Sequence, residues 1–460
     1  MLSLNLLRKK QLVRLKGVMI FILMSQVLFA QDPLDQYIQE GLHNNLVLKT
    51  KQVSLEKSLL ALKEARSLFL PTTYFDGMYT LAQGGRAISI PVGDLLNPVY
   101  ETLNQITGTD KFPTISNVEE QLLPNNFYDI RLKTTMPIVN NELKANRNIK
   151  QKETAIKENE LVIYKRELIK EIKTAYYQYL MADRAISIYD NALVVVRQNL
   201  RVNQSMLQNG KGLPAYVSRA ESEVTSVETQ LQNAKNEKQK ARAYFNSLLN
   251  RELTDSVSII ELQTEKAMAD AIQSEFDSIE GREELKSLQI SKAIQGDVLK
   301  MNKSFRMPKV NAYLDLAAQN FNFLVDDNSF FYLGGVQAVF PIFSGNRNLY
   351  KIKQTEYDIK QVDITTSNTR RQLELAAFNS KSNARNLYGN YSASLKTEES
   401  STLYFKLIDR GYKEGVNSFI ELLDARNQLT QSQLQVALNK YRFLASLADY
   451  ERQTSSYTLK

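Results

Sequence analysis

The sequence lacks cysteine altogether and has one histidine, His43, and both shortages restrict the chemistry open to the chain. Without cysteine there is no disulfide, no thiolate metal site and no lipid-modified N-terminal cysteine. His43 stands beside Asn44 and Asn45 in a polar stretch, a poor setting for a metal ligand or a general base. We find no nucleophile motif, metal-ligand cluster or phosphate-binding loop, so the sequence predicts neither an enzyme nor a cofactor site.

Glycine and proline are scarce as well, with 17 and 10 residues in a chain of 460, which argues against disorder and low complexity. Neither occurs between Leu143 and Leu207, which predicts one helix on the order of 100 Å long at ~1.5 Å per residue. Its apolar residues recur at steps of three and four, as in a coiled coil. They are Leu161, Tyr164, Leu168, Ile172, Ala175, Tyr179, Ala182, Ile186, Tyr189, Leu193, Val196 and Leu200.

Positive charge is concentrated near the N-terminus, where residues 1–30 have the pattern of a cleaved signal peptide. Basic residues precede an apolar run from Gly17 to Phe29, and cleavage is expected after Ala30. A run of this length is too short for a membrane anchor, which needs ~20 apolar residues. Because most of the net charge of +8 lies in this segment, the basic composition does not indicate a nucleic-acid partner.

The chain contains itself twice, in a unit of about 200 residues that is far larger than the ~20–50 residues of a solenoid repeat. Three pairs of segments align without gaps: Leu48–Pro71 with Leu285–Pro308, Met136–Ile138 with Phe340–Ile342, and Gly210–Ala220 with Gly415–Ala425. The sequence therefore predicts a first repeat over 31–250, a linker over 251–275 and a second repeat over 276–460. Each repeat is expected to hold a helix, two strands and a long helical hairpin.

Four segments alternate between apolar and polar residues with the period of a β-strand: Pro71–Gln83, Tyr128–Met136, 308–320 and 331–341. In the third segment, Leu314 and Leu316 share one face, and Asp315 and Gln319 share the other. In the second segment, the apolar face includes Ile130 and Leu132, and the polar face holds Asp129, Arg131 and Lys133. A soluble sheet packed against helices has the same alternation, so the pattern alone leaves both settings open.

Length and context favour the membrane setting. The strands have about 9–11 residues, the length that crosses a bilayer, and they form only two hairpins among very long helices. An exported chain without a transmembrane helix spans a membrane only as a closed barrel, because open edges leave backbone groups unpaired in lipid. Four strands cannot close a barrel, so the sequence predicts an oligomer.

The first repeat has a longer segment than the second between its two strands, from Gly84 to Asn125. It contains four prolines and is expected to be an irregular loop that faces the outside of the cell. Whether it folds back over a pore mouth is left open. In the second repeat, Asp326 to Asn328 lack the further ligands of a calcium-binding loop and are expected to form a hairpin turn.

Taken together, these segments resemble the TolC-type outer-membrane factors of tripartite efflux and type I secretion. The resemblance covers nearly all of the chain after residue 30. Three motifs carry it: L-K-x-x-Q…P before the first strand of each repeat, P-I-F-S-G-N-R at Pro341–Arg347, and G-Y-K-E-G-V-N-S-F-I-E-L-L-D-A-R at Gly411–Arg426.

The resemblance implies a mainly α fold with membrane β strands, built from a duplicated strand pair and long helical hairpin. It implies a homotrimer whose twelve strands form one barrel in the lipid of the outer membrane. The barrel is continued by an α-helical tunnel in the periplasm, with the linker 251–275 in its equatorial region. The implied partners are a periplasmic adaptor and an inner-membrane pump.

By the same resemblance, Tyr412 and Gly415 lie at the tip of the second hairpin, and Glu421 and Asp424 form an acidic ring at the pore constriction. The spacing of these two carboxylates puts them on one helix face, where a solvated face near a helix N-terminus is the alternative reading.

The tip of the first hairpin departs from the family pattern. Arg219 aligns with Asp424 across the two repeats, and we hypothesise that the two side chains pair between neighbouring coils. Gly210 and Gly415 are candidates for adaptor docking, although an ordinary hairpin turn explains them equally well.

One other class of protein also has a long helical hairpin: a periplasmic coiled-coil adaptor without its own pore. Such a protein has one hairpin flanked by small β-domains, in contrast to the duplicated unit found here. Within the transport reading, drugs, metals and proteins use the same kind of duct. The cargo is selected by the partners, so the sequence does not identify it.

Overall fold

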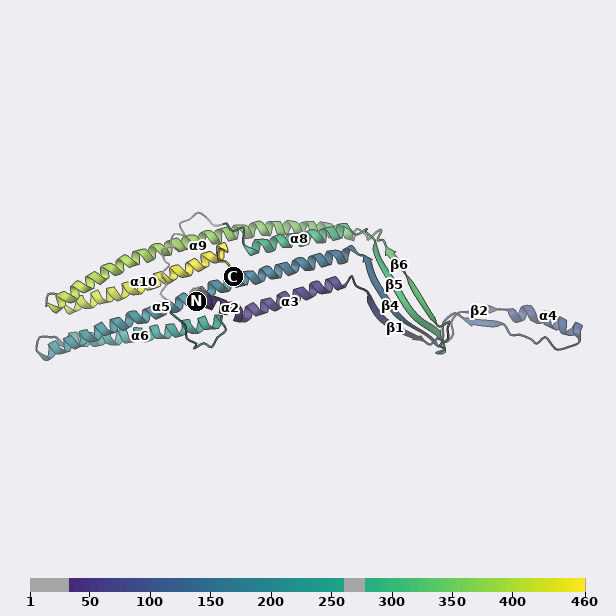
Figure 1. Cartoon of the computed structure of the whole chain (residues 1–460), viewed down its shortest axis with the longest axis horizontal. Helices are drawn as coiled ribbons and strands as arrows, with labels where there is room; N and C mark the ends of the chain where they lie inside the picture. The colour runs from purple at the N-terminus through teal and green to yellow at the C-terminus, as the bar shows by residue number, and fades with distance from the viewer. Residues whose placement is uncertain (1–32, 260–277, 460) are drawn as a thin grey trace, which may run out of the picture. The chain divides into compact units, whose positions relative to one another are not determined.

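The computed structural model describes residues 33–259 and 278–459 (Figure 1). The expected signal peptide over 1–30 and most of the expected linker over 251–275 lie outside the described residues. The chain divides into two compact units, which we call the helical unit and the sheet unit. The helical unit comprises Met1–Lys57, Thr154–Lys292 and Lys360–Lys460, and the sheet unit comprises Ser58–Glu153 and Ala293–Ile359.

The same order of elements occurs twice, as the internal duplication predicts. In the first repeat the order is α2 (Pro33–Asn44), α3 (Leu46–Ser67), β1 (Thr72–Thr80), β4 (Phe127–Val139), α5 (Asn141–Gln208) and α6 (Pro214–Leu248). In the second it is α8 (Glu283–Lys303), β5 (Lys309–Phe321), β6 (Phe330–Val339), α9 (Arg347–Lys413) and α10 (Phe419–Thr454). The chain is mainly helical with a few strands, in agreement with the predicted fold class.

The four long strands form one sheet in the order β1-β4-β5-β6, and every neighbouring pair is antiparallel. The central pair, β4 and β5, joins the two repeats within this sheet. The register places Phe75, Leu132, Leu316 and Tyr332 in one row across all four strands. At the far end of β5 the chain turns at Asp326, whose carboxylate accepts hydrogen bonds from Asn328 N and Ser329 Oγ, which confirms the expected hairpin turn.

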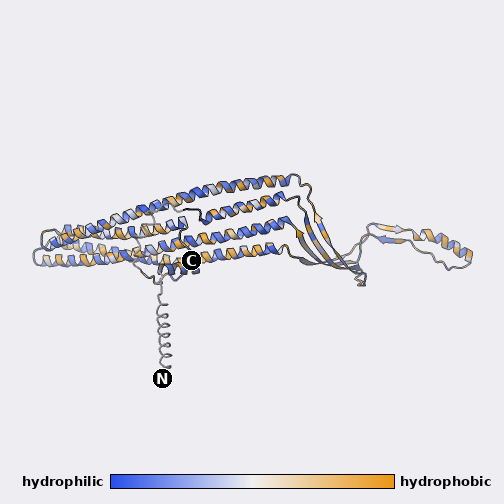
Figure 2. Ribbon diagram, turned by 45° about the horizontal axis from the view of Figure 1, so that its top comes forward, coloured by the Kyte–Doolittle hydropathy of each residue, from blue (hydrophilic) through white to orange (hydrophobic). Residues whose placement is uncertain are grey.

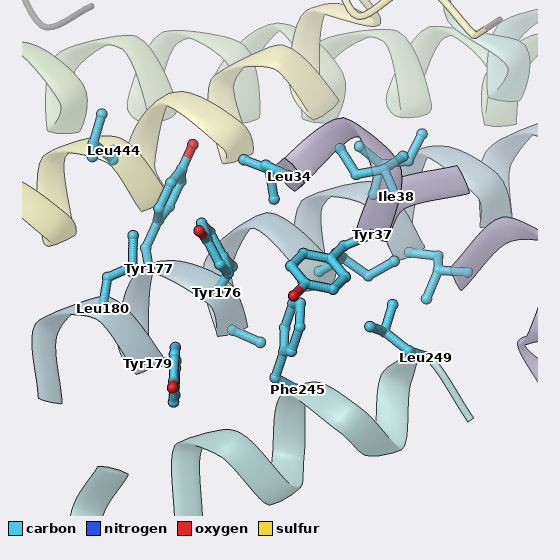
Figure 3. Packing of buried hydrophobic residues seen from close by; sticks show 14 of the residues in the cluster. Leu34, Tyr37, Ile38, Tyr176, Tyr177, Tyr179, Leu180, Phe245, Leu249 and Leu444 are labelled. Atoms are coloured by element: carbon cyan, nitrogen blue, oxygen red, sulfur yellow. The ribbon is translucent and has the colours of Figure 1, made fainter. Parts of the chain in front are cut away.

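The core of the helical unit is rich in tyrosine (Figure 3). Tyr37 meets Phe245 edge-on with ring centroids 5.1 Å apart, and Tyr176 is completely buried. Burial of a phenol costs free energy unless the hydroxyl is hydrogen-bonded, and the Tyr176 hydroxyl donates to the carbonyl of Ser258 at 3.0 Å. The apolar stripe expected on α5 packs inward, with Leu168, Ile172, Ala175 and Val196 buried.

The helical segment before β1, expected as a single helix in each repeat, is interrupted in the first repeat at Asn45, which separates α2 from α3. The Asn45 carboxamide oxygen accepts a hydrogen bond from Leu48 N at 3.0 Å, and its amide nitrogen donates to the carbonyl of Leu248 at 3.0 Å. The first bond is that of a helix N-cap, so Asn45 starts a new helix where the apolar periodicity continues unbroken.

The segment between β1 and β4 is not the irregular loop that the sequence predicted. It contains β2 (Ala87–Ile90), α4 (Val92–Thr107) and β3 (Val118–Gln121), and β2 pairs with β3. Proline favours the start of a helix, and Pro91 directly precedes α4, while Gly108 ends it in the left-handed conformation. Within the described ranges, no helix is both long enough and apolar enough to cross a membrane.

Candidate functional site

The four-stranded sheet exposes its apolar face and buries part of its charged face. Hydrophobic and hydrophilic residues are interspersed along its strands (Figure 2). Across the apolar face, Phe75, Leu316 and Tyr332 are 70%, 52% and 78% exposed. On the other face, Asp129 and Asp315 are only 8% and 9% exposed. A soluble sheet buries its apolar side chains. The arrangement in this sheet is the inverse, with the apolar side chains exposed and two of the charged ones buried.

Charges on the polar face are compensated within the sheet. Arg131 donates two hydrogen bonds to Asp129, at 2.7 and 2.5 Å, and Lys133 Nζ lies 2.5 Å from Asp76 Oδ2. The register also places Lys133 directly opposite Asp315. Opposite charges on neighbouring strands stabilise a sheet, so this face can stay charged without repulsion between its strands.

The helical unit contains the two hairpin tips, α5–α6 and α9–α10. Gly210 and Gly415 occupy corresponding places in the two turns, with φ angles of +68° and +79°. This left-handed conformation favours glycine and commonly ends a helix. Each glycine thus has a conformational reason to be there, the ordinary hairpin turn that the sequence left open beside adaptor docking. Their role in docking stays a prediction.

The two tips pack against each other through aromatic side chains. Phe419, at the start of α10, lies between Tyr216 of α6 and Tyr412 of α9, with ring centroids 5.6 and 6.2 Å away. Ala220 and Leu423 complete the buried part of this cluster. The two hairpins therefore share a small apolar core at their tips.

Beside this core, a buried ion pair joins the hairpins. Arg426 Nη2 of α10 lies 2.7 Å from Glu223 Oε2 of α6, with only 4% and 12% of the two side chains exposed. Arg219, one helical turn before Glu223, contacts the other carboxylate oxygen at 3.3 Å. Burial lowers the pKa of Arg426, and the charge of Glu223 acts in the opposite direction.

Arg219 therefore pairs with Glu223 in this chain, and the structure does not bring it to Asp424. Pairing of Arg219 with Asp424 between neighbouring chains remains a hypothesis. Arg426 and Glu223 were not among the residues that the sequence singled out. The available signal was an arginine in a predominantly apolar helix start, F-I-E-L-L-D-A-R.

Glu421 has a structural role in its own helix. Its carboxylate accepts a hydrogen bond from Ser418 N at 2.6 Å, and Ser418 Oγ accepts one from Glu421 N at 3.2 Å. This reciprocal pair is a capping box, which satisfies two free N–H groups at the start of α10. The backbone hydrogen bond from Ser418 is the largest cause that lowers the pKa of Glu421.

Asp424 and Tyr412 differ in their surroundings. Asp424 is exposed one turn after Glu421, so both carboxylates lie on the open face of α10. The Tyr412 hydroxyl is buried, and this burial raises the pKa of the phenol, while the nearby Asn203 side chain acts in the opposite direction. Among the described residues, no group of three or more His, Cys, Asp or Glu side chains is arranged to hold a metal ion.

Solved structures with the same fold include outer-membrane channels. The CmeC outer membrane channel of Campylobacter jejuni is 15% identical, with a TM-score of 0.71 over 92% of this chain and 85% of CmeC. The outer membrane protein VceC of Vibrio cholerae is 13% identical, with a TM-score of 0.70 over 92% and 95% of the two chains. The open state of the MtrE outer membrane channel of Neisseria gonorrhoeae is 14% identical, with a TM-score of 0.69 over 92% and 88%.

At these identities the likeness establishes the fold. No curated protein sequence matches the chain significantly. The profile of the family described as Outer membrane efflux protein, however, matches residues 37–251 and 280–450, which together make up most of both repeats. The chain therefore belongs to the outer membrane efflux protein family.

Proposed function

We propose that three copies of this chain form an outer-membrane exit duct, through which an efflux or secretion system releases cargo from the cell. The observation that carries the proposal is the inverted sheet, with apolar residues exposed on one face and compensated charges on the other. In a barrel, the first face contacts lipid and the second lines a water-filled lumen. No finding supports the alternative of a pore-less adaptor.

The edges of the sheet support closure between copies. β1 and β6 each have one neighbour in this chain, and the antiparallel order makes them run in opposite directions. The β6 edge of one copy can therefore pair with the β1 edge of the next as another antiparallel pair. Repetition of this contact around an axis leaves no open edge, as a membrane requires.

The number of copies follows from the size of the lumen. Two copies give eight strands, and side chains fill the interior of a barrel of about that size. Three copies give twelve strands, which enclose a wider interior, and a rotation by one third of a turn closes the ring. Three is thus the smallest number that leaves a passage for solutes.

The hairpins of the helical unit supply the rest of the duct in this proposal. They extend into the periplasm, where the tips close the passage and the turns at Gly210 and Gly415 dock a periplasmic adaptor linked to an inner-membrane pump. Glu421 and Asp424, with their carboxylates on an open helix face, form the acidic ring of the constriction. In a ring of three copies, six carboxylates favour cations over anions.

The proposal is tested by measuring the mass of the purified particle and its conductance in a bilayer. The mature protein, purified from membranes in detergent, is expected to have the protein mass of three chains by light scattering and to form ion-conducting channels in planar bilayers. A monomer that stays monodisperse in water without detergent contradicts the proposal. So does a trimer that never conducts, even after the tip residues described in the Discussion are altered.

A further inference from the structure

The extension between β1 and β4 carries a helix whose apolar face has no partner within the described chain. We propose that the α4 helices of neighbouring copies pack together as a short parallel coiled coil that caps the outer opening of the duct. This inference rests on the proposed assembly of three copies. It goes beyond that assembly because nothing in the barrel itself requires the extension.

The apolar residues of α4 follow the heptad repeat of a coiled coil. With Leu96 and Leu103 at position a, the residues at position d are Val92, Val99 and Ile106, so that the steps alternate between four and three. The a and d residues are the ones that face the partner helix in such an assembly. In this chain, Val99 and Ile106 are 50% and 76% exposed.

The side of α4 formed by positions b and e, next to the a residues, is covered by the segment that returns toward β3. Two asparagines at position b hold it, and each forms a pair of hydrogen bonds with one residue of the backbone. Asn97 pairs with Ile115 at 2.9 and 3.0 Å, and Asn104 pairs with Phe112 at 2.7 and 3.1 Å. A Cβ atom at Gly93, position e, would lie 2.4 Å from the Ile115 oxygen, so this close approach needs glycine.

The charged residues of α4 lie away from its a and d residues, which form the seam between helices in the proposed coil. Its acidic residues, Asp94 and Glu101, both fall at position f, the position farthest from the partner helices. No charged residue falls at positions e or g, where like charges of identical chains face each other and repel. Three copies can therefore approach along the a and d residues without electrostatic cost.

The types of residue at the seam favour more than two strands. In parallel coiled coils, leucine at a with a β-branched residue such as isoleucine at d shifts the preference to trimers or tetramers. A membrane surface is a less suitable partner, because interfacial helices are rich in lysine and arginine. The sixteen residues of α4 contain neither.

Assembly of the barrel supplies the concentration that such a short helix needs. A helix of 16 residues is marginal by itself in water. The extension leaves the sheet after Thr80 and returns at Phe127, the strand ends opposite those that connect to α3 and α5. Every copy in a symmetric ring presents its extension at the same end of the barrel. Tethering then makes the association of the helices effectively intramolecular.

Cysteine cross-linking tests the seam, because the chain has no native cysteine. In Val99→Cys the three thiols face one another in the proposed coil, and mild oxidation of the purified trimer is expected to give a covalent dimer on a non-reducing gel. The matched control is Glu101→Cys at position f, which is expected to stay monomeric on the gel. The mass of the native particle is measured first for both variants.

The outcomes separate this inference from the proposed assembly. If the particle is a trimer and both thiols remain unlinked, or if both cross-link equally, the coiled coil is wrong and the barrel stands. If the particle is a monomer, the assembly itself fails. Quenching of a fluorophore on the thiol of Val99→Cys by lipid-bound quenchers, without cross-linking, assigns α4 to the membrane surface and also overturns the inference.

Entry of large solutes from the outer side tests whether the α4 helices cap the duct. Val99→Asp with Leu103→Asp places six carboxylates in the proposed seam of three copies, which cannot stay packed when charged. Large hydrophilic solutes added from the outer side are expected to enter the channel of this variant at least several-fold faster than that of the unaltered protein. Asp94→Asn with Glu101→Gln, on the far side of α4, is the control. Equal entry rates for both variants contradict the cap.

Discussion

Arg426 and Glu223 stand 203 residues apart in the sequence and are joined by a charged hydrogen bond of 2.7 Å. The bond connects α10 of the second repeat to α6 of the first. Both side chains are nearly buried, so water does little to weaken the interaction. It is therefore a strong polar link between the two hairpins close to their tips.

Removal of one partner of this pair is expected to loosen the tips. Arg426→Leu leaves the Glu223 carboxylate buried with only the exposed Arg219 beside it, and loss of one partner of a buried pair costs about 3–5 kcal/mol. Hydrogen exchange at the ends of α6 and α10 is expected to rise by orders of magnitude. In planar bilayers, closed channels are expected to conduct more. Unchanged exchange shows that the aromatic cluster alone holds the tips.

An exposed ion pair provides the matched control. Arg197 and Glu228 link α5 to α6 at 2.7 Å, but 55% and 45% of their side chains are exposed. Exposed pairs contribute about 0–1 kcal/mol, so Arg197→Leu is expected to change neither exchange nor conductance measurably. The double variant Arg426→Leu with Glu223→Leu is expected to lose less stability than Arg426→Leu alone, because it leaves no buried charge.

Glu421 performs two roles that a pair of substitutions can separate. Glutamine also forms a capping box, so Glu421→Gln keeps the start of α10 intact and removes only the negative charge. If Glu421 belongs to the constriction, block of the channel by a trivalent cation is expected to weaken at least tenfold in this variant. Ser418→Ala has the opposite effect: it weakens the cap by about 1 kcal/mol and leaves the charge in place.

A neighbouring carboxylate serves as the control for this experiment. Glu414 lies in the turn before α10 and pairs with Arg410 at 2.9 Å, and Glu414→Gln is expected to leave block unchanged. Because hydrogen bonds lower the pKa of Glu421, its share of the block should persist below the pH at which an ordinary glutamate is protonated. Equal block in Glu421→Gln and the unaltered protein excludes Glu421 from the constriction.

The turn at Gly415 tests adaptor docking. Valine in the left-handed conformation costs about 1–2 kcal/mol, whereas asparagine adopts it far more easily. Gly415→Val is expected to disturb the turn and weaken binding of the cognate adaptor, measured by pull-down from membranes, while Gly415→Asn retains it. If both variants bind as the unaltered protein does, the turn is an ordinary hairpin end with no part in docking.

Ionisation of Glu284 makes the stability of the helical unit depend on pH. Hydrogen bonds from Arg282 and Arg452 more than offset the effect of burial and lower the pKa of Glu284 from 4.5 to about 2. The carboxylate thus stabilises the fold fully above about pH 4.5, and this contribution, about 3 kcal/mol at most, disappears as the pH falls toward 2. Glu284→Gln is expected to melt at a lower temperature at pH 7.

The difference in melting temperature between Glu284→Gln and the unaltered protein should shrink as the pH falls. Melting of both is followed by circular dichroism in detergent at several pH values between 7 and 2.5, with the exposed Glu56→Gln as control. Convergence of the two melting curves toward pH 2 agrees with the low pKa. A difference that is constant over this range means that the substitution acts through packing rather than through the charge.

The repeated elements were predictable because each has a strong local pattern. The expected strand over 308–320 is observed as Lys309–Phe321, and the expected strand over 331–341 as Phe330–Val339. Side chains of a strand alternate between its faces, so the apolar and charged faces could also be assigned. The alternation alone did not tell which face is exposed, since a packed soluble sheet has the same pattern; strand length and context were needed to favour an exposed apolar face.

The features that were missed depend on contacts or on competing signals. In the sequence Asn45 is an ordinary polar residue. Its role depends on the hydrogen bond that its side-chain amide donates to the carbonyl of Leu248, 203 positions away. The prolines between β1 and β4 suggested a loop, yet Pro91 precedes α4 and Pro98 lies inside it. The pairing of Arg426 with Glu223 requires that two hairpins be placed side by side, which no local pattern specifies.

The exposed face of the sheet gives the sharpest test of membrane insertion. Leu316 lies on the apolar face, in one row with Phe75, Leu132 and Tyr332. Arginine at the bilayer midplane on the lipid side of a barrel costs about 2–4 kcal/mol, so Leu316→Arg should insert poorly and yield less trimer in the outer-membrane fraction. Gln319 lies on the same strand but faces the other side, and Gln319→Arg should insert normally because its charge lies in water. Equal insertion of the two variants contradicts the assignment of the faces, and poor insertion of Gln319→Arg alone reverses it.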